Sequence, residues 1–233
     1  MRETAPEDLV ALLAAADASR LGAHLARDDL PAPVRVLALA WTHRWTEALA
    51  TAAVVGPHDP PLARAAAAWA AAADPGPGSA AALDRVVAWV RTPGAVDARD
   101  PLDGFAAYVA VEAALAHARP ALARELLDLV VDAPLPGPVL PVLPVLPVLP
   151  VLMACCRARV LTFHGDVAAA HDAWTTASPL RDALPPGSAT ATLHDATGCL
   201  VAGNRSERTR AAALARQVAA ALDDPGAGAD AEA

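Results

Sequence analysis

The 233-residue sequence contains no lysine and no isoleucine, and only 3% of its residues are aromatic. All 18 basic residues are therefore arginine, against 26 acidic residues, which gives a net charge of −8. An acidic chain without a basic stripe is poorly suited to binding nucleic acid, so we expect no nucleic-acid partner. Alanine supplies much of the 55% hydrophobic content, so each helix can bury little apolar area and thin helix–helix interfaces are expected.

Cysteine is also scarce, with Cys155, Cys156 and Cys199 as the whole set and no C-x-x-C spacing. Three thiols without framework spacing indicate no disulfide scaffold, and we interpret them as inert thiols of a reduced protein. Residues 1–9 include three acidic residues and lack the basic-then-apolar order of a signal peptide. A cytoplasmic location is therefore expected.

Charge is absent from residues 133–156, a run as long as a membrane span. Seven prolines interrupt this run, and a single span must be helical to satisfy its backbone, so we expect no membrane association. Within it, Pro138–Leu152 consists of five Pro-Val-Leu triplets. Proline at every third position disfavours α-helix throughout, which predicts an extended insertion over residues 133–152.

Elsewhere, apolar residues recur at helical spacing between clusters of Pro, Gly and Asp, and no stretch alternates like a strand. The sequence predicts an all-α fold: an N-terminal helical array over residues 1–132, C-terminal helical hairpins over 153–222, and a disordered tail over 223–233. Ser79 is predicted to be an N-cap. The expected helices cover residues 6–27, two segments between 34 and 55, then 62–73, 79–91, 101–118, 120–131, 153–164, 167–176, 189–201 and 206–222.

One segment carries a motif of small and aromatic residues at fixed spacing: Gly165, Asp166, Val167, Ala170, Trp174, Ala177 and, after the expected helix, Pro179. This segment resembles the second helix of a tetratricopeptide repeat. Weaker copies place a small residue at Ala48, Ala82 and Ala123. The match is partial, because Ala154 and Arg157 stand where the motif has tryptophan and leucine. The resemblance implies a helical-hairpin array that binds a protein segment in a groove.

Two sets of residues are candidates for contact with such a partner. Trp41 and Trp45 are spaced i, i+4, which predicts one helical face that either packs in the core or offers an aromatic ledge. Arg205 and Arg208, with Arg210 nearby, open the last expected helix. They either bind an acidic partner or lie on a solvated helix start.

Paired histidine and aspartate suggest an alternative chemistry. Such pairs on helices are the hallmark of metal-dependent HD phosphohydrolases, and the candidate ligands are His164, His171, Asp172, His194 and Asp195. Structural roles compete with this interpretation, because Asp166 is already explained as the turn residue before a helix. No phosphate-binding loop or nucleophile motif is present in the sequence, and no catalytic residue or cofactor is predicted.

These observations predict a non-catalytic protein-interaction scaffold or regulatory module with a protein or peptide partner. A metal-dependent hydrolase and a structural remnant of a larger regulator are the alternatives. The identity of the partner, any ligand and the oligomeric state are left open.

Overall fold

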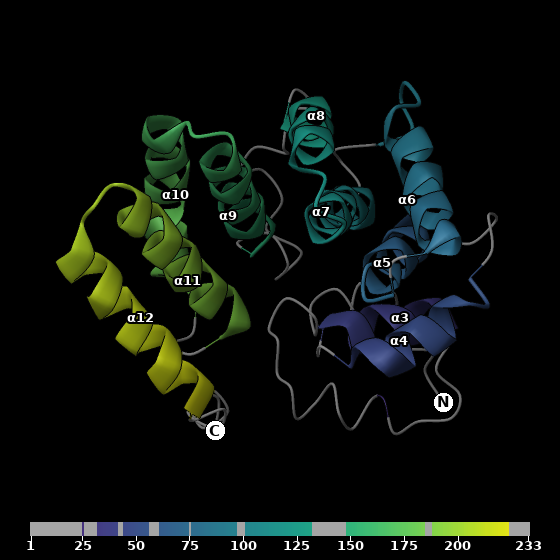
Figure 1. The fold of residues 1–233 in the computed structure, drawn as a ribbon, viewed down its shortest axis with the longest axis horizontal. Coiled ribbons are helices and arrows are strands. Elements are labelled where there is room, and N and C mark those ends of the chain that lie inside the picture. Colours follow the sequence, from purple (N-terminus) through teal and green to yellow (C-terminus); the bar gives the residue numbers. More distant parts are fainter. Residues whose placement is uncertain are drawn as a thin grey trace. The chain divides into compact units, whose positions relative to one another are not determined.

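The computed structural model consists of helices and the turns that follow them in the residues that it describes, which are 25, 32–41, 44–55, 61–74, 76–96, 101–131, 148–184 and 188–223. No strand occurs among these residues, which confirms the all-α prediction. The helices are α3 (Ala32–Trp41), α4 (Trp45–Ala52), α5 (Pro61–Ala71), α6 (Pro77–Val90), α7 (Pro101–Ala116), α8 (Pro120–Val131), α9 (Val148–Phe163), α10 (Val167–Arg181), α11 (Ala189–Asn204) and α12 (Arg208–Asp223), shown in Figure 1. The helix expected over 6–27 and the tail after Asp223 lie outside these ranges, apart from residue 25.

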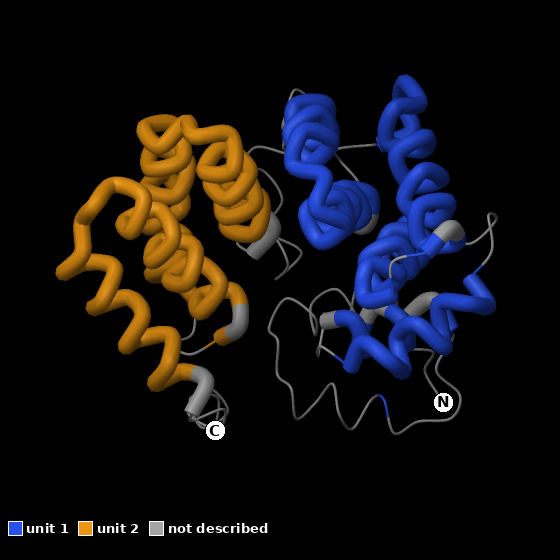
Figure 2. Tube along the Cα trace, in the orientation of Figure 1, with its two compact units in different colours: residues 1–10, 19–143 blue, residues 11–18, 144–233 orange. Residues whose placement is uncertain are grey.

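The chain divides into two compact units (Figure 2). The first contains α3 to α8, and the second contains α9 to α12. In the first unit α5 packs against α3, α4, α6 and α7. In the second unit α11 packs against both helices of the preceding hairpin, α9 and α10, as well as against its own partner α12.

Alanine dominates the interfaces of the first unit. Most of α5 is buried through small side chains, namely Ala63, Ala65, Ala66, Ala67, Ala68, Ala70 and Ala71. The facing helix α7 is buried from Phe105 to Ala114. Small residues let two helix backbones approach closely, so these helices pack along their length although each contact area is small.

One turn geometry recurs at four helix–helix connections. The residue before the second helix donates its backbone N–H to the carbonyl five residues earlier at 2.9–3.0 Å. It also accepts the N–H of the residue four positions later at 2.9–3.0 Å. The four residues are Arg44, Arg119, Asp166 and Glu207. The first bond is the one that closes a Schellman motif, so one residue ends a helix and starts the next.

The residue before this turn position is left-handed where the structure describes it: Ala118 has φ 55°, Gly165 φ 77° and Ser206 φ 61°. Gly165 fits without strain, which explains the Gly-Asp pair recognised in the sequence. Four residues after the turn stands an alanine: Ala48, Ala123 and Ala170 are buried, and Ala211 is half-buried. The copy expected at Ala82 lacks this turn, because a Pro/Gly segment with Gly76 as N-cap precedes α6.

The prediction that Pro138–Leu152 excludes α-helix is wrong for its last five residues, because α9 begins at Val148. Residues 138–147 lie outside the described part of the chain. Pro150 is the third residue of α9, where the backbone N–H of a helix has no intrahelical acceptor. Proline is tolerated in this first turn, so the final triplets can join the helix.

Two further local predictions are corrected. Ser79 is not an N-cap: α6 begins at Pro77 with Gly76 as its N-cap, and Pro77 suits the first helical position. Pro179 does not follow α10 but lies inside it, since the helix continues to Arg181. Proline there leaves the carbonyl of Thr175 without its amide donor, and the cost falls only on the last turn of the helix.

None of the helices in the described ranges combines the length and the apolar character needed to cross a membrane.

Candidate functional site

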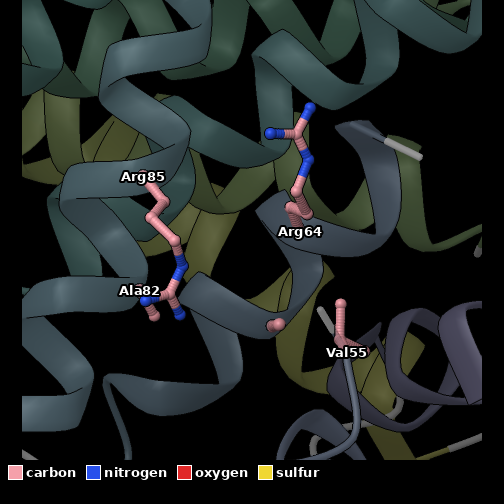
Figure 3. A pocket seen from close by; sticks show the side chains of 5 residues that line it. Val55, Arg64, Ala82 and Arg85 are labelled. Atoms are coloured by element: carbon pink, nitrogen blue, oxygen red, sulfur yellow. The ribbon is translucent and has the colours of Figure 1, made fainter. Parts of the chain in front are cut away.

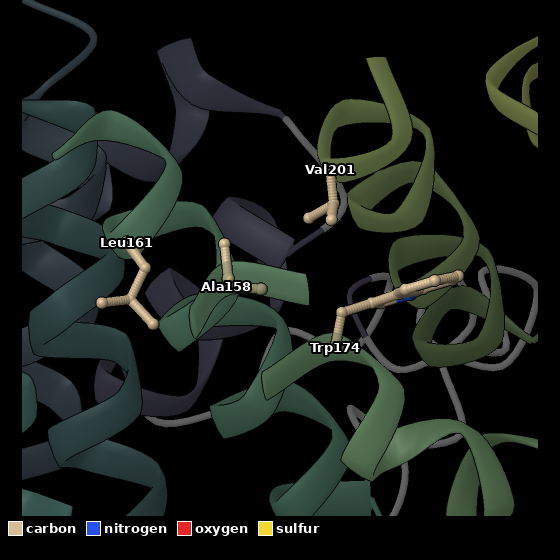
Figure 4. Packing of buried hydrophobic residues seen from close by; sticks show 5 residues of the cluster. Ala158, Leu161, Trp174 and Val201 are labelled. Carbon is tan, nitrogen blue, oxygen red and sulfur yellow. The ribbon is translucent and has the colours of Figure 1, made fainter. Parts of the chain in front are cut away.

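Trp174 is the centre of the second unit. Its side chain is 4% exposed and projects from α10 into a cluster with Ala158 and Leu161 of α9 and Val201 of α11 (Figure 4). The indole Nε1–H donates to the carbonyl of His194 at 3.0 Å. The guanidinium of Arg210, from α12, lies 4.7 Å from the ring centroid. One side chain of α10 therefore touches residues of α9, α11 and α12, the other helices that the structure describes in this unit.

The approach of α11 to this ring depends on Gly198. A Cβ built on Gly198 would lie 2.4 Å from Cζ2 of Trp174, closer than side-chain carbons come in folded proteins. The absence of a side chain at Gly198 thus creates the slot that the indole fills, in the middle of α11 where glycine is otherwise unfavourable.

Two of the predicted histidines lie beside this ring. His194 is 2% exposed and stacks on Trp174 with centroids 5.3 Å apart. Its Nε2 lies 3.3 Å from the Trp174 carbonyl and its Nδ1 lies 3.5 Å from Asp195 Oδ1. His171 meets Trp174 edge-on at 6.1 Å. Both nitrogens of His194 are thus directed at protein acceptors.

Asp195 forms a bidentate ion pair with Arg181. The Nε of Arg181 donates to Oδ1 at 3.0 Å, and a second guanidinium nitrogen donates to Oδ2. Burial alone would raise the pKa of Asp195, but hydrogen bonds from His194 and Arg181 outweigh it and lower that pKa. The same contact raises the pKa of Arg181. The pair ties the last turn of α10 to α11 and leaves the carboxylate little capacity for another ligand.

The five predicted metal ligands are only partly brought together. His171, His194 and Asp195 gather around Trp174, whereas His164 lies exposed in the turn after α9 and Asp172 is 84% exposed. In the described residues no three His, Cys, Asp or Glu side chains are grouped so that they could hold a metal ion. The geometry fits a satisfied polar core better than a metal centre.

The tryptophans predicted to contact a partner lie on different helices. Trp41 is the last residue of α3 and Trp45 the first of α4, so the prediction of one helical face is wrong. The chain turns between them, with the N–H of Arg44 bonded to the carbonyl of Leu39. Trp45 is half-buried and meets Trp69 edge-on at 5.4 Å. The side chain of Trp41 lies outside the described set.

The predicted basic pair stands at the turn before α12. Arg205 Nε donates to Glu207 Oε1 at 2.6 Å, and Arg210 contacts the other oxygen of Glu207 at 3.5 Å. These contacts lower the pKa of Glu207, chiefly through the hydrogen bond from Arg205. Arg208 is exposed as the first residue of α12. Glu207 already occupies the place that an external anion would take at Arg205.

A small open pocket lies in the first unit, lined by Val55, Arg64, Ala67, Ala82 and Arg85, with about 210 Å³ of empty space that includes open solvent (Figure 3). Arg64 Nε is buried without a hydrogen-bond partner, and its guanidinium lies 6.0 Å from the ring of Trp89. In Figure 3 the side chains of Arg64 and Arg85 point in opposite directions, so the two charges do not converge on one ligand.

One polar cluster, formed by Ser79, His117 and the carbonyl of Ala68, was not predicted from the sequence. Ser79 Oγ lies 3.3 Å from His117 Nδ1, and His117 Nε2 lies 2.9 Å from the carbonyl of Ala68. The only local signal was a serine near a helix start, which also fits an ordinary cap. Ser79 and His117 are 38 residues apart in the sequence, and His117 and Ala68 are 49 residues apart, so no local pattern connects them.

Comparison with known proteins adds no relative: no family model, no curated protein and no solved structure matches this chain.

Proposed function

We propose that this protein is an interaction scaffold, built from a row of helical hairpins, that binds a segment of a protein partner on an exposed helical face. The observation that carries the proposal is the turn shared by Arg44, Arg119, Asp166 and Glu207. Repetition of one hairpin geometry is typical of arrays in which each hairpin contacts its neighbours, and such arrays use extended surfaces for binding.

The second unit supports this proposal through its packing. The helix α11 lies against both α9 and α10, as the first helix of a following hairpin does in a helical array. The polar groups around Trp174 bond to one another rather than lining a cavity. Their arrangement favours a role in holding the hairpins together.

The exposed side of α11 is the surface that we assign to the partner. The helix α11 contains one charged residue, Asp195, which is buried and contacts Arg181 of α10. The opposite side shows only uncharged side chains that are exposed or half-buried: Thr192, Leu193, Ala196, Leu200, Gly203 and Asn204. Leu200 lies on this side and is 38% exposed. An uncharged helical face of this kind suits an apolar segment of a partner.

The test is affinity capture with matched variants. Leu200→Glu places a charge on this face, whereas Ala219→Glu places the same charge on an exposed position of α12. Proteins captured from a lysate at native expression are compared for the wild type and both variants by quantitative mass spectrometry. We expect a partner that Leu200→Glu loses and Ala219→Glu keeps. A captured set that is identical for all three proteins would contradict the assignment of this face.

A further inference from the structure

We propose that Ser79 and His117 form an acyl-transfer pair, in which Ser79 Oγ attacks a small activated ester and His117 serves as general base. This activity goes beyond the scaffold role. It uses residues of the first unit, on α6 and in the turn after α7, and none of the residues assigned to partner binding.

The hydrogen bonds fix the protonation of the imidazole. A carbonyl can only accept, so the Ala68 carbonyl at 2.9 Å requires the proton of His117 to be on Nε2. Nδ1 then carries a lone pair, and the Ser79 hydroxyl lies 3.3 Å from it. The Ser79 hydroxyl, the His117 imidazole and the Ala68 carbonyl thus form a chain of two hydrogen bonds. The carbonyl takes the place that a carboxylate has in the common catalytic triad.

The Ala68 carbonyl is available for this role because α5 ends there. The amide of Ala72 bonds to the carbonyl of Trp69 at 3.1 Å, one residue short of the α-helical partner. Ala68 therefore presents one of the last carbonyls of α5, where the helix carries partial negative charge. This end of the helix favours the positive charge that His117 gains when it takes the proton.

Ser79 stands at the opposite kind of helix end. It is the third residue of α6, whose first turn carries partial positive charge and amide groups without intrahelical acceptors. The amide of Gly78, one residue before the nucleophile, belongs to this first turn. The two helix ends thus polarise the serine and the histidine in the direction of proton transfer.

The residues around the nucleophile differ in exposure. Ser79 itself is 6% exposed. Gly78 is exposed, and a Cβ built on it would meet no atom within 4 Å. The backbone next to the nucleophile is therefore open to solvent, and a small ester is the appropriate probe.

The reaction follows from these positions. The Ser79 hydroxyl proton moves to His117 Nδ1 while Oγ bonds to the acyl carbon, and the carbonyl oxygen becomes an oxyanion. The bond to the leaving alcohol then breaks, and the leaving oxygen takes the proton from Nδ1. Water repeats these steps on the acyl-serine and releases the acid. Nε2 keeps its proton on the Ala68 carbonyl throughout.

The experiment uses the full chain with a small fluorophosphonate and with p-nitrophenyl acetate. Intact-mass and peptide mass spectrometry should find one covalent adduct on the peptide that contains Ser79, and the acetate should release p-nitrophenolate. Ser79→Ala should remove both signals, and His117→Gln should slow them about 10²-fold or more, the usual contribution of a general base. Ser188→Ala, which alters the N-cap serine of α11, is the matched control and should keep both.

Circular dichroism shows whether each variant is folded, and Ser79→Cys provides a second variant that keeps a nucleophile and its approximate volume. Equal labelling rates in wild type and folded His117→Gln would overturn the proposal. It would also be overturned if the folded wild type carried no adduct on Ser79, because the pair would then serve only to tie α6 to the end of α5. Neither result depends on whether α11 binds a partner.

Discussion

Gly198 and Trp174 are complementary in shape: the indole of Trp174 occupies the volume that a side chain at Gly198 would need. A Cβ on Gly198 would lie 2.4 Å from Cζ2 and 2.6 Å from Cε2 of the ring. Both atoms belong to the large, buried ring that also donates to the His194 carbonyl, so the ring cannot swing away without losing that bond. The close approach of α11 to this ring therefore requires glycine at position 198.

Gly198→Ala is expected to destabilise the second unit. An added methyl group in a packed core costs about 1–3 kcal/mol, and here it must displace a tryptophan that contacts three helices. Urea unfolding followed by circular dichroism measures the loss. Hydrogen exchange of peptides from α10 and α11 then locates it.

The control for this change lies on the same helix. Gly203 also belongs to α11, but a Cβ built on it meets no atom within 4 Å. Gly203→Ala should therefore stabilise the protein by about 0.4–1 kcal/mol, because alanine restricts the unfolded chain more than glycine does. The two substitutions are therefore expected to change stability in opposite directions, and a stabilising Gly198→Ala would contradict the packing described for Trp174.

The buried Asp195 should make the second unit sensitive to acid. Its pKa is lowered in the folded state, so its contribution is complete above the ordinary value of 3.8 and is lost as the pH falls through the lower, folded value. Asp195→Asn should cost about 1.5–3 kcal/mol at neutral pH, the usual size of a hydrogen bond to a charged group. It should also reduce the acid dependence of unfolding.

This dependence is measured by urea unfolding at neutral pH and again below 3.8. Asp172→Asn is the matched control, because Asp172 is 84% exposed on α10 and makes no comparable contact with Arg181. If Asp195→Asn and Asp172→Asn lose the same free energy of unfolding at neutral pH, the contact with Arg181 contributes nothing specific to stability.

Local signals in the sequence were sufficient to place most of the helices that the structure describes, and several connections. Asp166 was recognised as a turn residue, and its side chain accepts from the amide of Ala169 at 3.1 Å. Pro101 and Pro120 were recognised as first helical residues, and both open helices. These features depend on residues within one turn of each other, so a single segment contains the information that determines them.

For the cluster around Trp174, the sequence predicted which polar residues matter but not how they are arranged. His171, His194 and Asp195 were singled out from the sequence, but their packing around Trp174 depends on Gly198 and Arg181, which are separated in sequence and carry no motif. The error at Ser79 has the same origin. A serine near a helix start predicts a cap, and only the fold shows that His117 takes its side chain instead.

Two prolines inside helices should respond in different ways to alanine. Pro179 lies in the last turns of α10, so Pro179→Ala restores an amide donor to the Thr175 carbonyl. A stabilisation of about 1–2 kcal/mol is expected, less than the full helix-interior cost of proline because the unfolded chain gains freedom. Pro150→Ala in the first turn of α9 restores no such bond and should not stabilise. The urea concentration at the midpoint of unfolding measures the stability of each variant. Equal midpoints for Pro179→Ala and Pro150→Ala would argue against a helix that continues through Pro179.

The turn before α8 stores backbone strain that glycine should relieve. Ala118 has φ 55°, a left-handed conformation that costs a residue with a side chain about 1–2 kcal/mol, whereas the equivalent position before α10 is Gly165. Ala118→Gly should stabilise the first unit by about 0.5–1 kcal/mol after the added entropy of the unfolded glycine is subtracted. Thermal unfolding by circular dichroism measures this change. Ala88→Gly, at an exposed position inside α6, is the control and should lose about 0.5–1 kcal/mol. If Ala118→Gly loses as much as Ala88→Gly, the left-handed turn is not the conformation that the protein adopts there.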